Sequence, residues 1–141
     1  MKTMTIKTGS AIVLTALTVL FSGTVFPSVP SAKEYPNVDW QRAELNYIAA
    51  LTSDNLGVRR SAVNFLGEYR LTNAIEPLIT VLKHDKVENV RMAAALALIL
   101  IGVPAGRAAV EEASLYDGSD KVAKFCQSLL TADNSSISAT E

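Results

Sequence analysis

Cysteine and histidine are almost absent from the chain, which has one of each, Cys126 and His84. A single cysteine excludes an intramolecular disulfide and a cysteine-based metal cluster, so the fold must depend on its hydrophobic core. The lone histidine has no paired carboxylates near it at helical spacing and therefore lacks the partners of a zinc site. His84 and Asp85 are adjacent in a predicted turn, without a serine or cysteine nucleophile at a suitable spacing. We therefore expect no catalytic site, no metal and no cofactor, and we predict a protein that is not an enzyme.

An excess of positive charge is also missing, since 13 lysine and arginine residues stand against 14 acidic ones. Nucleic-acid binding needs a clustered basic surface, whereas these cations are scattered among acids, and we expect no nucleic-acid partner. Apolar residues make up 49% of the chain and charged residues 19%, proportions typical of a packed globular protein. A length of 141 residues leaves room for one domain.

The first 32 residues have the three-part layout of a secretory signal peptide. Lys2 and Lys7 precede an apolar run over residues 11–21, and small residues follow at 29–32. Cleavage is expected after Ser31 or Ala32, which makes the protein exported, either periplasmic or secreted. The alternative is an uncleaved membrane anchor, although the run is shorter than the roughly 20 residues that span a bilayer. The polar, proline-interrupted segment 33–39 is predicted to be a linker.

Beyond residue 39, apolar residues recur at helical spacing, and the same pattern returns about every 32 residues. Its three copies begin at Val58, Val90 and Val122, and each continues with apolar residues four, seven and eight positions later, which is one helix face. A shorter helix is predicted before each copy, over residues 41–51, 75–82 and 106–115. Helix pairs at a fixed period indicate a solenoid, in which roughly three units are needed for stability. The domain is predicted over 40–131, in units 40–72, 73–104 and 105–131, followed by a disordered tail over 132–141.

The central unit carries the most specific motif. Residues 74–85 contain Pro77, paired leucines and a turn aspartate, and Val90-Arg91 opens the second helix. This pattern resembles a HEAT repeat, and Ser53-Asp54 with Val58-Arg59 is similar in the first unit. The resemblance covers about 90 residues and implies an all-α fold, a short right-handed α-solenoid (α-α superhelix) of about three HEAT-like helix pairs. The third unit departs from the family pattern, because Ala123 stands where the arginine is expected.

Two arginines at the same repeat position, Arg59 and Arg91, have two possible roles. The HEAT resemblance implies that each hydrogen-bonds a turn aspartate, Asp54 or Asp85, between neighbouring units, a role that suits the guanidinium fork. The alternative is a basic stripe for an anionic ligand.

The central second helix is apolar for ten residues, 92–101, where its neighbours are polar. A helix that is apolar all round is either buried or bound to another molecule. We predict an exposed docking spot made by Met92, Leu96 and Leu100. The alternative is that these three residues are core. The polar residues expected around the spot are Arg60, Asn64 and Lys124.

These features together predict a non-catalytic scaffold module that binds a protein or peptide in an exported setting. One alternative is a homo-oligomeric structural element of the cell envelope, in which the apolar spot meets its own copy across a two-fold axis. Another is a bilin-lyase-like HEAT protein, since some HEAT-like repeat proteins resemble the bilin lyases, and this would imply handling of a tetrapyrrole.

Overall fold

The computed structural model describes residues 37–138, and these residues form helices and turns without a strand. The prediction of an all-α fold, a short α-solenoid, is confirmed. The helices are α2 (Trp40–Ala50), α3 (Leu56–Glu68), the 3-10 helix η2 (Thr72–Ala74), α4 (Ile75–His84), α5 (Glu88–Ile101), α6 (Pro104–Tyr116) and α7 (Asp120–Ser138). The predicted signal peptide over 1–32, residues 33–36 of the linker and residues 139–141 of the tail lie outside the described residues.

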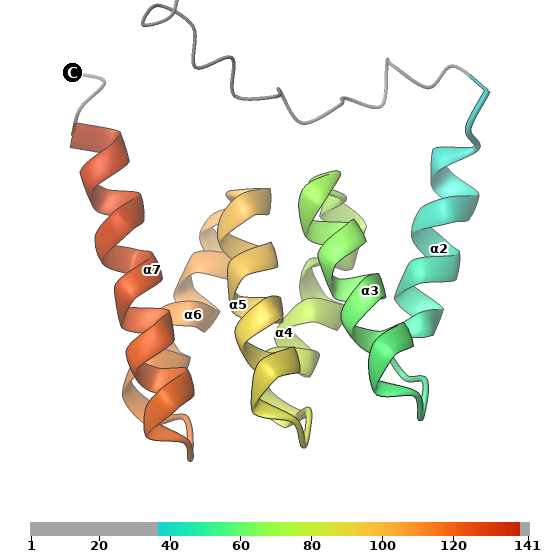
Figure 1. Cartoon of the computed structure of the whole chain (residues 1–141). Helices are drawn as coiled ribbons and strands as arrows, with labels where there is room; N and C mark the ends of the chain where they lie inside the picture. Colours follow the sequence, from blue (N-terminus) through green and yellow to red (C-terminus); the bar gives the residue numbers. More distant parts are fainter. Residues whose placement is uncertain (1–36, 139–141) are drawn as a thin grey trace, which may run out of the picture.

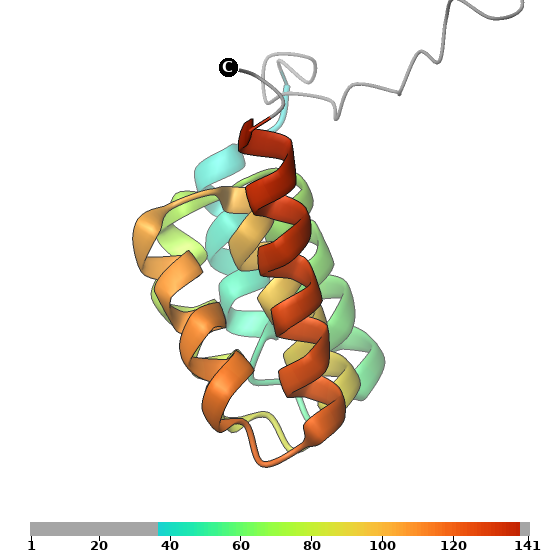
Figure 2. The ribbon, with the colours of Figure 1, turned by 90° about the vertical axis from the view of Figure 1, so that its left-hand side faces the viewer.

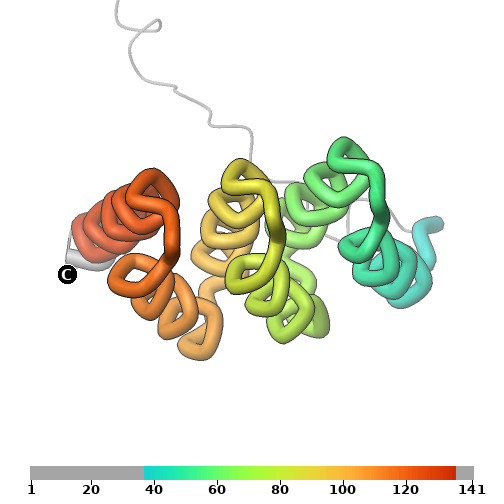
Figure 3. Tube along the Cα trace, turned by 90° about the horizontal axis from the view of Figure 1, so that it is seen from below, coloured from blue at the N-terminus to red at the C-terminus, as the bar shows by residue number. Residues whose placement is uncertain are grey.

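The helices form two layers (Figure 1). Viewed along the helix axes, α3, α5 and α7 lie side by side in one row, and α2, α4 and α6 form a second row alongside it (Figure 3). The quarter-turn view in Figure 2 shows the same two layers from the C-terminal end of the stack. Helix α5 is central, because it contacts α3, α4, α6 and α7.

Local sequence signals set several helix ends. Asp39 caps α2 by accepting a hydrogen bond from the Arg42 amide at 3.0 Å. Asn55 caps α3 in the same way, accepting from the amides of Gly57 and Val58 at 2.8 and 3.2 Å. Gly102 ends α5 with a φ of 78°, a left-handed conformation that glycine adopts without steric cost.

The core lies between the two layers and extends through all three units. Its largest fully buried aliphatic side chains come from five helices, namely Val63, Leu66, Leu78, Leu82, Val90, Leu98, Val110 and Val122. Helices α3 and α5 come especially close at Gly67. A Cβ atom on this glycine would lie 2.6 Å from the Cβ atom of Ala97, so the glycine is what permits the close packing.

Helix α2 makes one polar and one aromatic contact that the sequence analysis did not predict. The carboxylate of Glu44, which is buried, accepts hydrogen bonds from the backbone amide and side-chain amide of Asn73 at 3.0 and 2.8 Å. The rings of Tyr47 and Phe65 stack with their centroids 3.7 Å apart. The first contact ties α2 to η2 and the second packs α2 against α3, so both hold α2, the outermost helix of the described residues.

The prediction of a disordered tail is wrong for residues 132–138. Helix α7 extends to Ser138, whereas residues 132–141 were predicted to be a disordered tail. The extension has a physical reason, because Arg107 of α6 binds the side chains of Asp133 and Asn134 and holds the last turns of α7. Val58 is 43% exposed, although its repeat equivalents are buried, since no earlier helix pair of the described residues covers it.

Candidate partner-binding surface

The surface of the row α3, α5 and α7 carries exposed apolar side chains at its centre. Leu96 and Leu100 lie one turn apart on α5 and are each 40% exposed, and Met92 is half-buried one turn before them. Their exposure follows from the fold, since the inward face of α5 is already filled by alanines and by Val90 and Leu98. The two leucines are thus on the surface, whereas Met92 packs against the core.

Two adjacent hollows lie beside these side chains and share part of their lining. The first has a volume of about 360 Å³ and lies between Arg60, Asn64, Met92 and Leu96, with Phe125 of α7 at its edge. The second has a volume of about 330 Å³. Its lining includes Asn64, Gly67 and Glu68 of α3 together with Leu96, Ala97 and Leu100 of α5. Asn64 and Leu96 border both hollows, so they form one groove along the contact between the two helices.

We call this feature the α3–α5 groove, and it is bordered by Arg60, Asn64 and Glu68 on one side and by Met92, Leu96 and Leu100 on the other. Small residues bring the two helices close together at Gly67 and Ala97, which both line the second hollow.

The predicted docking residues are distributed along this groove. Arg60, Asn64, Met92 and Leu96 come together in the first hollow, and Leu100 lies in the second. Lys124 lines neither hollow. The sequence prediction missed Glu68, whose position one turn after Asn64 on α3 was the available signal. It also missed Phe125, for which helical spacing gave no signal because the residue belongs to a different helix pair.

The charged residues at the ends of the groove are not neutralised by neighbours. Arg60 and Glu68 are exposed, and among the salt bridges of residues 37–138 neither takes part. The groove therefore combines an apolar middle with Arg60 at one end and with Glu68 and Arg70 at the other, an arrangement suited to binding another protein surface.

Arg59 and Arg91 form a ladder between units. Arg59 donates to the carboxylate of Asp85 through Nε at 2.8 Å and Nη2 at 3.3 Å. Arg91 donates to Asp117 in the same way, at 3.0 and 2.9 Å. The Nη1 atom of each arginine also donates to a backbone carbonyl of the preceding turn, that of Ser53 or that of Asp85, at 2.9 Å. Both arginines are thus committed to protein acceptors, which favours the structural role over an anionic ligand.

The side chain of Asp54 is not the ladder residue of the first unit. Asp85 accepts from the amide of Val87, two residues on, and the residue that makes this contact in the first unit is Ser53, whose hydroxyl accepts from the amide of Asn55 at 3.2 Å. The prediction placed the aspartate one residue too late in the repeat register. Asp54 contributes only its carbonyl oxygen, 3.2 Å from Nη1 of Arg59.

The ladder carboxylates are electrostatically stabilised in their ionised form. Burial alone would raise the pKa of Asp117, but hydrogen bonds from Arg91 and from the Ser119 amide, together with the charge of Arg91, hold this pKa below its ordinary value. The pKa of Asp85 is lowered against the same effect of burial by Arg59 and the Val87 amide. Each pair is therefore a charge-assisted, bidentate contact between neighbouring units.

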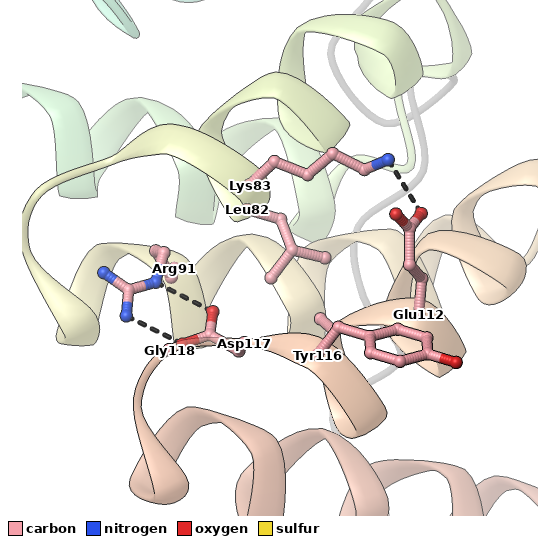
Figure 4. A pocket seen from close by; sticks show the side chains of 8 residues that line it. Leu82, Lys83, Arg91, Glu112, Tyr116, Asp117 and Gly118 are labelled. Atoms are coloured by element: carbon pink, nitrogen blue, oxygen red, sulfur yellow. Dashed lines mark hydrogen bonds and ion pairs between the residues drawn. The ribbon is translucent and has the colours of Figure 1, made fainter.

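A third hollow lies on the opposite layer, between α4 and α6, with a volume of about 280 Å³ (Figure 4). Lys83 bridges it to Glu112 at 2.7 Å, and the Arg91–Asp117 pair lies at its other end (Figure 4). The rim residue Tyr116 is 79% exposed. The charged groups here are paired with each other, so this hollow offers a ligand fewer free partners than the α3–α5 groove.

The side chains that could act in catalysis or bind a metal do not lie close together. His84 is exposed at the end of α4, and Cys126 is buried in α7. Burial, with a smaller effect of the Asp117 charge, raises the pKa of the Cys126 thiol to about 11, which keeps it protonated. Within the described part of the chain, no three histidine, cysteine or acidic side chains are grouped as metal ligands.

The family model for HEAT repeats matches residues 46–137. No curated protein and no solved structure matches the chain. Among the described residues, no helix combines the length and the apolar character that crossing a membrane requires.

Proposed function

We propose that this chain, which belongs to the HEAT-repeat family, is a non-catalytic scaffold that binds a protein through the α3–α5 groove in an exported setting. HEAT repeats generally serve as protein-interaction scaffolds, and that general role is the starting point. The observation that carries the specific proposal is the exposure of Leu96 and Leu100 beside two adjacent hollows. An exposed apolar strip rimmed by polar residues is typical of a protein-binding surface.

The proposal is tested by placing a photo-crosslinking amino acid at Leu96 and irradiating the cells that make the protein. We expect a protein adduct of defined mass at this position. A matched probe at Thr80, which is exposed on α4 in the other layer, should give none. The adduct should disappear when Leu100→Glu introduces a charge into the groove. Equal labelling at both positions, or none at either, would contradict a docking role for the groove.

The exported setting is supported by the signal-peptide layout of residues 1–32 and needs its own measurement. The mass of the protein purified from the expressing cells should correspond to a chain that starts at Ala32 or Lys33. The protein should also lie in the periplasmic or secreted fraction. A full-length chain found in the cytosol would rule out export and leave the binding surface unaffected.

A further inference from the structure

The residues along the α3–α5 groove are arranged symmetrically about its midpoint. On α3, Asn64 lies between Arg60 and Glu68, each four residues away. On α5, Leu96 lies between Met92 and Leu100 at the same separations. Each helix thus carries a row of three side chains about 12 Å long. If a second α3 helix runs antiparallel to this row, its Glu68 lies opposite Arg60 and its Arg60 lies opposite Glu68.

We propose that a second copy of this chain occupies the groove, in a dimer whose copies meet face to face across a two-fold axis. This inference rests on the proposed function, since it names the partner for the same surface. In a two-fold interface, residue i contacts residue j and j contacts i, so the surface must be complementary to itself. We place the two-fold axis in the plane of the contact, perpendicular to the helices and at the level of Asn64 and Leu96. Each helix of one copy then faces the same helix of the other copy and runs antiparallel to it.

This axis pairs opposite charges and apolar side chains. Arg60 faces the partner's Glu68, and Glu68 faces the partner's Arg60, so each dimer contains the ion pair twice. Met92 faces the partner's Leu100, and Leu96 meets the partner's Leu96 on the axis. Arg60 and Glu68 are exposed and take part in no salt bridge within residues 37–138, so both remain free for this contact.

The same axis lays Arg60 over a hollow that both Glu68 and Arg70 of the partner line, with Glu68 at the level of Arg60. Arg70, the other cation beside the groove, comes to the level of the partner's Val58, which is exposed. On α7, Lys124 comes to the level of the partner's Ala132. The hollow at the Arg60 end of one copy lies over the hollow at the Glu68 end of the other copy. Their volumes, about 360 and 330 Å³, are similar.

The size of the contact sets how tight the dimer is. Three helices about 20 Å long, spaced about 10 Å apart, offer a face of roughly 600 Å² per copy. The total of about 1,200 Å² is at the lower end of specific interfaces, and it predicts a dimer that dissociates on dilution.

Charge reversal tests the arrangement. The protein is purified in the form its cells deliver, and its mass is measured by sedimentation equilibrium between about 1 and 500 μM, a range that brackets micromolar affinity. Arg60→Glu places two acids opposite each other in both ion pairs, and Glu68→Arg places two cations there. Each single variant should weaken self-association by roughly tenfold or more. The matched control is Arg42→Glu, which reverses an exposed charge on α2 and should leave the dimer unchanged.

An experiment that mixes the two single variants is the decisive test. Equimolar Arg60→Glu and Glu68→Arg chains form two ion pairs of opposite charge when combined, so the mixture should dimerise as strongly as the parent. The double variant with both changes should do so as well. Circular dichroism of each variant establishes that it is folded, and the mixture tests the geometry even if one variant is destabilised.

A parent protein that stays monomeric at about 500 μM overturns the inference. So do single variants that associate like the parent, or a mixture that fails to recover. If the parent is monomeric but the Leu96 probe crosslinks a different protein, the second copy is the wrong partner and the proposed function stands. If the parent is monomeric and the probe gives no adduct, both are wrong.

Discussion

Replacing Gly67 by alanine tests the closest approach of two helices in the fold. The added Cβ atom would lie 2.6 Å from the Cβ atom and 2.7 Å from the Cα atom of Ala97. Carbon atoms pack best at about 3.5–4.0 Å, so α3 and α5 must separate by roughly 1 Å. The neighbouring atoms belong to or adjoin the backbone and cannot rotate away.

The expected magnitude combines two opposing effects. Alanine favours a helix over glycine by about 1 kcal/mol, which offsets part of the loss. Overpacking costs about 1–3 kcal/mol and reaches the upper end here, because whole helices have to move. The free energy of unfolding should therefore fall by about 2 kcal/mol in the Gly67→Ala variant.

Urea unfolding followed by far-ultraviolet circular dichroism measures this change. Gly118→Ala is the control, since a Cβ atom there has no neighbour within 4 Å, and it should alter stability by less than about 0.5 kcal/mol. Adding Ala97→Gly to Gly67→Ala should recover only part of the loss, because the new methyl group would still lie 2.7 Å from the backbone at position 97. A Gly67→Ala protein as stable as the parent would show that α3 and α5 do not pack as closely as described.

Three further predictions address the ladder, the thiol and the groove. The pKa of Asp117 is lowered in the folded state, so its contribution to stability is complete above the unfolded value of about 3.9 and is lost as pH falls through the folded pKa. Urea unfolding at stepped pH should show this decline below about pH 5, and Arg91→Met should cost about 3 kcal/mol at neutral pH because it leaves the carboxylate unpaired. Cys126 should resist a thiol reagent in the native protein at mildly alkaline pH and react fully in denaturant, so rapid native labelling would contradict its burial. Leu96→Glu and Leu100→Glu should each lower stability by less than about 1 kcal/mol, whereas unfolding of either variant would place these residues in the core.

The sequence predicted the helix pairs because repeated burial leaves a repeated pattern. Val90 and Val122, one repeat apart, are both fully buried in the core, and Ala94 and Cys126 fill equivalent buried positions. A periodic pattern of this kind survives in the sequence without any knowledge of which helices touch.

Contacts between distant residues left no such signal. The last turns of α7 are polar and resemble a disordered tail in composition, yet Arg107, 26 residues earlier, binds Asp133 and holds them in the helix. The stacking of Tyr47 on Phe65 likewise depends on how α2 lies against α3. Composition describes a segment in isolation, and these two contacts depend on its neighbours.

The ladder shows how an error of one residue in the repeat register assigns a structural role to the wrong side chain. Aligning aspartates placed Asp54 in the repeat, whereas the hydrogen bond to the residue two positions later identifies Ser53. The side-chain type alone was misleading, because adjacent Ser53 and Asp54 are both common in turns. Backbone geometry distinguishes them.

Ser53 and Ala123 also affect whether two copies of the chain can stack end to end. Each ladder contact joins an arginine of one unit to a carboxylate of the next, as Arg91 joins Asp117. If two copies stacked end to end, the third unit of one would present Ala123 and the first unit of the other would present Ser53, so neither half of an ion pair would be present. The contact that stabilises neighbouring units within the chain is therefore missing from an end-to-end junction. Self-association through the face of α3 and α5 uses Arg60 and Glu68 instead, and the charge-reversal experiment separates the two geometries, because an end-to-end dimer would be indifferent to both residues.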